Sequence, residues 1–178
     1  KIREPLSHME VELMRKACKT DFDEALFETF YSTGCRVGEI VNMKISDIDF
    51  EKEQIKVCGK GDKERFVLLT PRAHLSLKIY LKNRTDDNPG VFVSEKRGNK
   101  PLGKCSLENR IRELGKLAGL GRIVTPHIIR HTTASHLLEY TDLDVVQEIL
   151  GHTKIETTRI YAKTSRERIK TEFKKASL

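Results

Sequence analysis

Residues 125–161 carry four side chains whose chemistry suits attack on a phosphodiester: two histidines, an arginine and a tyrosine. Arg130 follows His127 by three positions, His152 follows a Leu-Gly pair, and Tyr161 follows a polar Thr-Thr-Arg run. A phenol can act as the nucleophile, while guanidinium and imidazole groups stabilise the charge that builds on the phosphate oxygens. The set therefore predicts phosphodiester chemistry that needs no metal.

The first pair is positioned by the start of a helix. Thr125 and Pro126 are typical of the N-cap and the first helical position, and the helix is expected to run to about residue 140. His127 and Arg130 then share one face of the first turn, where unpaired backbone N–H groups favour an anion.

The second pair is expected on turns. A second apolar helix stops at Gly151, which is typical of a C-cap, and so delivers His152 on a turn. A short helix over residues 155–160 would present Tyr161 near its end. Each residue alone has an ordinary structural explanation, such as a cap, a surface ion pair or half-buried core, so the prediction depends on the ordered set.

An earlier segment, Thr33-Gly34-Cys35-Arg36-Val37-Gly38-Glu39, adds another cation. Glu39 lies three residues after Arg36 on a predicted helix, so the two share a face and the carboxylate could orient the guanidinium. The alternative is a surface ion pair worth well under about 1 kcal/mol. The guanidinium fork binds two phosphate oxygens and stays charged, so an arginine suits a phosphate site.

Residues 45–70 change to a period of two, as half-buried strands do. The apolar positions of the two predicted strands are Ile55, Val57, Phe66 and Leu68. Gly59-Lys60-Gly61-Asp62 supplies the turn of a hairpin, and the result is a short antiparallel sheet. Lys60 and Lys63 lie at this turn. A lysine there is usually solvated, but it could also reach into a DNA groove and protonate a leaving oxygen.

Composition indicates one domain with an anionic partner. The chain has 178 residues, a net charge of +7 and a pI of about 9.2, with −3 on residues 1–56 and +10 on residues 57–178. The four cysteines are scattered and are expected to be reduced thiols in the core, as in a cytoplasmic protein. Further helices are expected at residues 7–18, 21–34, 71–84 and 107–117 and at the C-terminus, with Asp21 as a cap. A strand is expected at residues 91–93.

Three stretches, TPHIIRHTTASHLL, VVQEILGH and TTRIYAK, resemble the signature of the tyrosine recombinases, which include phage-integrase and Xer-like enzymes. The resemblance covers residues 5–163. It implies an α+β, mainly α-helical fold: a helical bundle with a small three-stranded antiparallel sheet. It also implies six catalytic positions, all of them filled: Arg36, Lys60, His127, Arg130, His152 and Tyr161. Lys63 is the alternative to Lys60.

The resemblance implies a site-specific recombinase or integrase that cleaves and rejoins DNA through a 3′-phosphotyrosine, without cofactor or metal. The alternatives are a type IB topoisomerase-like enzyme, which religates the same strand, and a DNA-binding module without chemistry. A metal hydrolase built on His127 and His131 is disfavoured, because Ile128 stands where a zinc-protease motif has glutamate. Integration, transposon movement and chromosome-dimer resolution all share such a domain.

Double-stranded DNA is the expected partner, and no membrane contact is expected. The resemblance implies that the protein assembles as a tetramer on DNA and that the free domain is a monomer. The cytoplasm is the expected location, with the protein on the nucleoid when DNA is bound. Residues 1–178 are expected to be the catalytic domain, without the N-terminal core-binding domain of full-length members. The C-terminal helix could pack in cis or on a neighbouring protomer. The expected DNA contacts are Lys63, Arg65, Lys96, Arg97, Lys100, Lys104 and Arg159.

Overall fold

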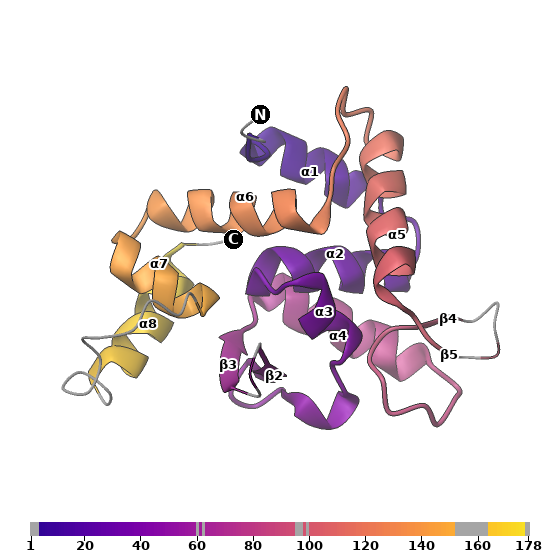
Figure 1. The fold of residues 1–178 in the computed structure, drawn as a ribbon, viewed down its shortest axis with the longest axis horizontal. Coiled ribbons are helices and arrows are strands. Elements are labelled where there is room, and N and C mark those ends of the chain that lie inside the picture. The colour runs from indigo at the N-terminus through magenta and orange to yellow at the C-terminus, as the bar shows by residue number, and fades with distance from the viewer. Residues whose placement is uncertain are drawn as a thin grey trace.

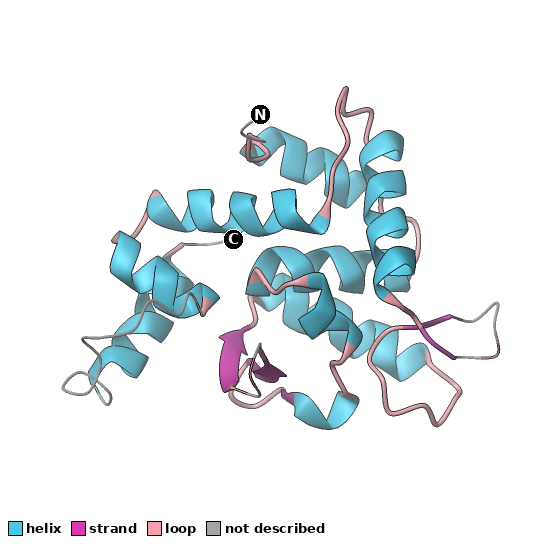
Figure 2. Ribbon diagram, viewed as in Figure 1, coloured by secondary structure: helices cyan, strands magenta, loops and turns pink. Residues whose placement is uncertain are grey.

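The structure, a computed structural model, describes residues 4–59, 61, 63–94, 98, 100–151 and 164–176, and gives only the backbone of residues 164–168. It is mainly helical (Figures 1 and 2). The helices are α1 (His8–Ala17), α2 (Asp21–Thr33), α3 (Val37–Val41), α4 (Pro71–Asn83), α5 (Lys104–Leu117), α6 (Pro126–Leu138), α7 (Leu143–Leu150) and α8 (Thr164–Lys175), with a 3-10 turn, η1 (Ile45–Asp47). The strands are β1 (Ile48–Asp49), β2 (Gln54–Cys58), β3 (Glu64–Leu68), β4 (Val93–Ser94) and β5 (Lys100–Pro101).

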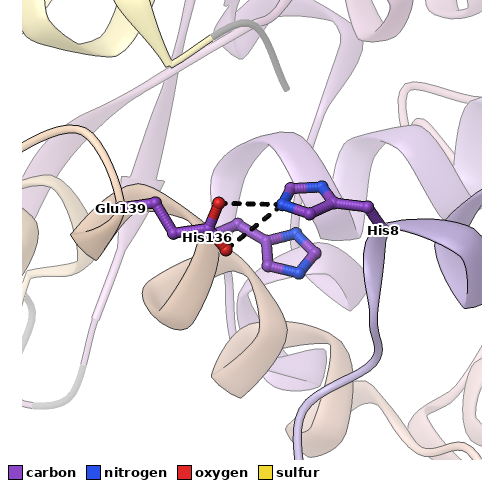
Figure 3. A group of neighbouring side chains, drawn as sticks. All are labelled: His8, His136 and Glu139. Atoms are coloured by element: carbon purple, nitrogen blue, oxygen red, sulfur yellow. Dashed lines mark hydrogen bonds and ion pairs between the residues drawn. The ribbon is translucent and has the colours of Figure 1, made fainter.

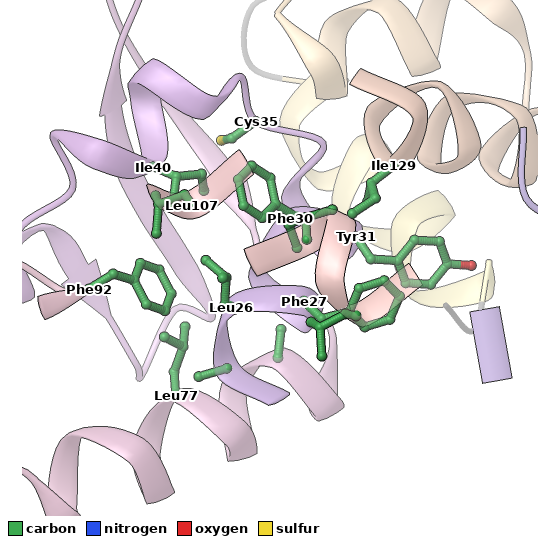
Figure 4. Packing of buried hydrophobic residues seen from close by; sticks show 14 of the residues in the cluster. Leu26, Phe27, Phe30, Tyr31, Cys35, Ile40, Leu77, Phe92, Leu107 and Ile129 are labelled. Carbon is green, nitrogen blue, oxygen red and sulfur yellow. The ribbon is translucent and has the colours of Figure 1, made fainter. Parts of the chain in front are cut away.

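Helix α2 is the centre of the main core, because ten of its 13 residues are buried. It packs against α4 on one side and α6 on the other, while α5 packs against α1 and α3 (Figure 1). Figure 4 shows the aromatic residues of α2 among aliphatic side chains from these helices. The predicted burial of this helix is confirmed, but its N-cap is Thr20, whose side chain accepts from the N–H of Asp23, and not Asp21.

The three-stranded antiparallel sheet has the order β1-β2-β3, as expected. Its register corrects the predicted faces of β3. Ile55 pairs with Val67 and Val57 pairs with Arg65, and paired residues share a face of the sheet. Val67 and Arg65 therefore point to the core side, whereas Phe66 is 45% exposed on the other side.

Other expectations need smaller corrections. The strand expected at residues 91–93 is observed as the shorter β4, which pairs with β5 in a second, two-stranded sheet. Helix α4 buries Ala73, Ser76, Leu77 and Tyr80, so two of its apolar residues, Leu75 and Ile79, are exposed. No disulfide joins the cysteines, and only Cys35 of the four is buried.

The C-terminal helix α8 packs in cis. Phe173 and Ala176 lie in a second apolar cluster with Leu137 of α6 and the buried face of α7. The apolar stripe of α8 therefore covers the α6–α7 corner of its own chain. None of the helices in the described part of the chain combines the length and apolar character needed to cross a bilayer.

Candidate active site

Helix α6 positions two of the predicted residues. The Thr125 side chain accepts from the N–H of Ile128, and Pro126 occupies the first turn, as the sequence predicted. His127 is exposed at this end, whereas Arg130, one turn on, is only 8% exposed. The N-terminal part of α6 therefore presents an imidazole to solvent and holds a guanidinium in the protein wall.

Arg36 is placed by the turn between α2 and α3. Gly34 ends α2 with φ +59°, a left-handed conformation that favours glycine. Arg36 is the N-cap of α3, and its N–H donates to Glu39 Oε2 at 2.8 Å. Its side chain is 54% exposed, with Nη1 at 3.7 Å from Glu39 Oε1. Glu39 therefore contacts Arg36 mainly through the backbone N–H, and its role in orienting the guanidinium stays a prediction.

Arg130 ties this turn to the end of α7. Its Nη1 donates to the carbonyl of Gly34 and its Nη2 to the carbonyl of Leu150, at 3.0 Å. Gly34 and Leu150 also touch, because a Cβ on Gly34 would overlap Leu150 Cδ2. Gly151 then ends α7 in the left-handed region, at φ +65°. One buried guanidinium thus fixes the turn before Arg36 and the turn before His152 relative to α6.

A pocket of about 260 Å³ opens between these elements. It is lined by Cys35, Arg36, Val37, Glu108, Arg112, Thr125, Pro126, His127 and Arg130. Three guanidinium groups and one carboxylate make its wall basic. Burial and the positive charge of Arg36 lower the pKa of Arg130. The positive charges of the two arginines therefore repel each other. A bound oxyanion would relieve this repulsion, and the N-terminus of α6 favours the same charge.

Sequence reasoning missed two residues of this pocket, Glu108 and Arg112. They lie four apart on α5, with Arg112 Nη2 at 3.9 Å from Glu108 Oε2. Lys104 stands one further turn back, against Gly38 of α3. The spacing of four places these side chains on one helix face, but it is also typical of a surface ion pair, so the sequence carried no signal that this face borders the site.

Arg65, expected to contact DNA, faces inward in this structure, and its DNA contact stays untested. Its side chain is 19% exposed, and its guanidinium is bidentate to Glu39, with Nη1 to Oε1 at 2.5 Å and Nη2 to Oε2 at 3.1 Å. The physical reason is the register of β3, which places it on the core face opposite Val57. Lys63, Lys100 and Lys104 are exposed and stay predictions as DNA contacts.

Several predicted residues lie outside the part of the chain that the structure describes. They are Lys60, Lys96, Arg97, His152, Arg159 and Tyr161, together with the short helix expected at residues 155–160. The described part brings Arg36, His127 and Arg130 to one pocket, and places Glu39 behind Arg36. Gly59 and Gly151, the neighbours of Lys60 and His152, both approach Arg65.

One group of described residues has the composition of a metal site: His8, His136 and Glu139, with ligand atoms within 4.8 Å of one another (Figure 3). Its geometry does not fit an ion. The two imidazoles are stacked at 3.8 Å with an interplanar angle of 18°, so their in-plane lone pairs run side by side and do not converge. His136 also has both ring nitrogens engaged, with Tyr31 Oη at 2.7 Å and the carbonyl of Leu6 at 2.9 Å.

Comparisons with known proteins identify the family of this chain. The model of the phage integrase family matches residues 4–168. Tyrosine recombinase XerA of Pyrococcus furiosus is 39% identical over 159 residues, which cover 88% of this chain and 55% of that protein. The crystal structure of XerA recombinase has a TM-score of 0.80 at 34% identity, covering 97% of this chain and 65% of the other.

A crystal structure of XerH site-specific recombinase, bound to palindromic difH substrate in a post-cleavage complex, has a TM-score of 0.70 at 28% identity. It covers 96% of this chain and 52% of the XerH chain. The chain spans about half the length of the curated relatives it matches. The extent of the family match and the identity to XerA confirm the resemblance seen in the sequence: this chain belongs to the phage integrase family.

Proposed function

We propose that this chain is the catalytic domain of a site-specific tyrosine recombinase, which cleaves and rejoins double-stranded DNA through a 3′-phosphotyrosine. The observation that carries the proposal is the convergence of Arg36, His127 and Arg130 on one basic pocket at the N-terminus of α6. The XerA and XerH relatives, of which the XerH structure holds its DNA substrate, support the same assignment.

In this mechanism Arg36 and Arg130 bind the non-bridging oxygens of the scissile phosphate, and charge builds on these oxygens in the transition state. Arg130 is suited to this because two carbonyls fix the plane of its guanidinium at the pocket wall. His127, exposed in the first turn of α6, assists proton movement at the nucleophile.

Tyr161 attacks phosphorus, so a bond from its phenolic oxygen to phosphorus forms as the bond from phosphorus to the 5′ oxygen breaks. Lys60 gives a proton to that leaving oxygen, with Lys63 as the alternative donor, and His152 donates a hydrogen bond to the phosphate. The phosphodiester energy is kept in the protein–DNA link. Attack by a different 5′ hydroxyl then reverses the step and exchanges strands.

We also propose that the exposed lysines Lys63, Lys100 and Lys104 contact the DNA backbone, which carries no sequence information but positions the protein. Strand exchange needs more than one active site, so assembly as a tetramer on DNA belongs to the same proposal. The free chain is expected to be monomeric.

Covalent trapping tests the proposal. The chain is mixed with nicked duplexes of randomised sequence in EDTA and compared with Tyr161→Phe. A denaturation-resistant adduct formed only by the parent supports the phenol as nucleophile and a metal-free reaction. Holliday-junction products from paired sites then distinguish strand exchange from topoisomerase-like religation.

A negative result also discriminates. If salt-sensitive DNA binding persists without an adduct, the assay is repeated with a core-binding domain from a family member fused before residue 1. Because the chain spans about half of its relatives, this fusion tests whether added DNA clamping is required. Absence of an adduct from the fusion refutes the proposed function.

A further inference from the structure

Arg65 lies where three segments that carry proposed catalytic residues meet. It belongs to β3, one strand of the hairpin whose turn includes Lys60. Its guanidinium holds Glu39 in the first turn of α3, beside Arg36. Its other side lies against Gly151, the residue before His152, because a Cβ on Gly151 would stand 2.5 Å from Arg65 Cδ and 2.9 Å from Cζ.

The Glu39 carboxylate is shared between these segments. Oε1 and Oε2 accept from the fork of Arg65, and Oε2 also accepts from the N–H of Arg36. Glu39 is 6% exposed, so its charge needs a buried partner. Burial by itself would raise the pKa of Glu39, but the hydrogen bonds from Arg65 and from the backbone of Arg36 hold that pKa below its ordinary value.

The hairpin closes over this pair. The position of a Cβ on Gly59 lies 3.6 Å from Arg65 Nη1 and 3.7 Å from Glu39 Oε1, and the N–H of Gly59 donates to the carbonyl of Lys63 at 2.9 Å. Nε of Arg65 is buried without a hydrogen-bond partner in the described part of the chain. This arrangement does not suit a DNA ligand, because the guanidinium faces inward and two of its three nitrogens already bind Glu39.

We propose that Arg65 is a positioning residue: by holding Glu39 and packing on Gly59 and Gly151, it keeps the start of α3, the β2–β3 hairpin at Gly59 and the end of α7 in one arrangement. The inference rests on the proposed function and deepens it. Arg65 acts opposite Arg130, which ties the neighbouring carbonyls of Gly34 and Leu150 from the α6 side. The site is thus held between two arginines, of which Arg130 lines the pocket and Arg65 does not.

The chain offers a matched control in the pair of Arg15 and Glu28. Arg15 Nε and Nη2 donate to the two oxygens of Glu28 at 2.6 and 3.1 Å, and the side chains are 13% and 2% exposed, against 19% and 5% for Arg65 and Glu39. Arg15 lies on α1, outside the pocket lining. Its loss should lower stability in the same way without touching the site.

The experiment measures single-turnover adduct formation at saturating nicked duplex, and DNA affinity across a salt series, for Arg65→Gln, Arg65→Lys, Glu39→Gln and the double variant with both glutamines. A misplacement of about 1 Å caused by a change away from the chemistry can cost about 100-fold in rate. We expect Arg65→Gln to slow cleavage by up to about that factor, with DNA affinity and its salt slope unchanged. Arg65→Lys, which keeps the charge but loses the fork, should not restore the rate.

Two further comparisons decide the matter. In the Glu39→Gln background, Arg65→Gln should add little further loss, and Arg15→Gln should lower the melting temperature without slowing cleavage by the folded protein. Near-normal cleavage by Arg65→Lys, together with a shallower salt slope for Arg65→Gln, would overturn the inference in favour of a phosphate contact. Equal slowing by Arg15→Gln at equal stability would overturn it in favour of a general stability effect.

Amide hydrogen exchange keeps the test independent of the proposed function. Arg65→Gln should speed exchange at residues 36–39 and 150–151, and Arg15→Gln should not. Unchanged exchange there overturns the positioning role of Arg65 even if the parent cleaves DNA. Failure of both the parent chain and its fusion with a core-binding domain to form a Tyr161-dependent adduct instead refutes the proposed function, and the exchange result then decides on Arg65.

Discussion

Replacing Arg130 with alanine should lower both cleavage and stability, whereas replacing Arg36 should lower cleavage alone. The difference follows from burial. Arg130 is 8% exposed and donates to two buried carbonyls, those of Gly34 and Leu150. A buried acceptor left without a donor costs about 1–3 kcal/mol, so the loss of Arg130 should cost about 2–6 kcal/mol. For a chain of this size the melting temperature should fall by at least roughly 4 °C.

Arg36 has no comparable structural role. Its side chain is 54% exposed and stands 3.7 Å from Glu39, and an exposed ion pair of this kind contributes at most about 1 kcal/mol. Its charge also lowers the pKa of Arg130, after the larger effect of burial, so its removal relieves a repulsion. The stability of Arg36→Ala should therefore stay within about 0.5 kcal/mol of the parent.

Both variants should lose roughly 100- to 1,000-fold in the rate of adduct formation, as expected for one preorganised donor at a developing oxyanion. Calorimetry or denaturant unfolding gives the stability, and trapping on nicked duplexes gives the rate. The control is Arg122→Ala, because Arg122 also donates to two carbonyls, those of Glu4 and Pro5, at 2.8 Å each but away from the pocket. It should lose less stability than Arg130→Ala, because its acceptor carbonyls are not fully buried, and it should keep its rate.

Either of two results would contradict this prediction. Equal melting temperatures for Arg36→Ala and Arg130→Ala would show that the carbonyl contacts of Arg130 do not hold the two turns. Near-normal cleavage by either variant would remove the pocket from the mechanism.

Three further outcomes are expected. Gly151→Ala should cost more stability than Gly119→Ala in denaturant unfolding. Both glycines have positive φ, which should cost about 1 kcal/mol in Gly119→Ala, but only at Gly151 would the added Cβ also overlap Arg65. Thermal stability should fall as the pH drops below about 6.5, because burial lowers the pKa of His136 and the folded state therefore favours the neutral imidazole. The stability that His136 contributes is complete above that pH and is lost as the pH falls. His136→Gln should flatten the profile of melting temperature against pH. Phe173→Ala should cost about 3–5 kcal/mol and speed amide exchange in α8, since this side chain is 5% exposed in the second cluster; unchanged exchange would contradict packing in cis.

The sequence by itself determined the local features that place the candidate site. Thr125 and Pro126 specify the start of α6 through a side-chain cap and a fixed φ, and Gly34 and Gly151 specify the ends of α2 and α7 through the left-handed region. These are short-range effects of a few neighbouring residues. The order of the reactive side chains along the chain also sufficed to indicate the family.

Only the tertiary structure decided how those features are assembled. Arg65 looked like a surface cation because the alternation of Phe66 and Leu68 was assigned to the wrong face of β3, and a strand pattern cannot reveal its register before the pairing with β2 is known. Glu108 and Arg112 gave no sign of bordering the pocket, since helix spacing fixes a face but not what packs on it. The packing of α8 in cis was open for the same reason. Each depends on contacts between residues distant in sequence, which form only when the core of α2 brings the other elements together.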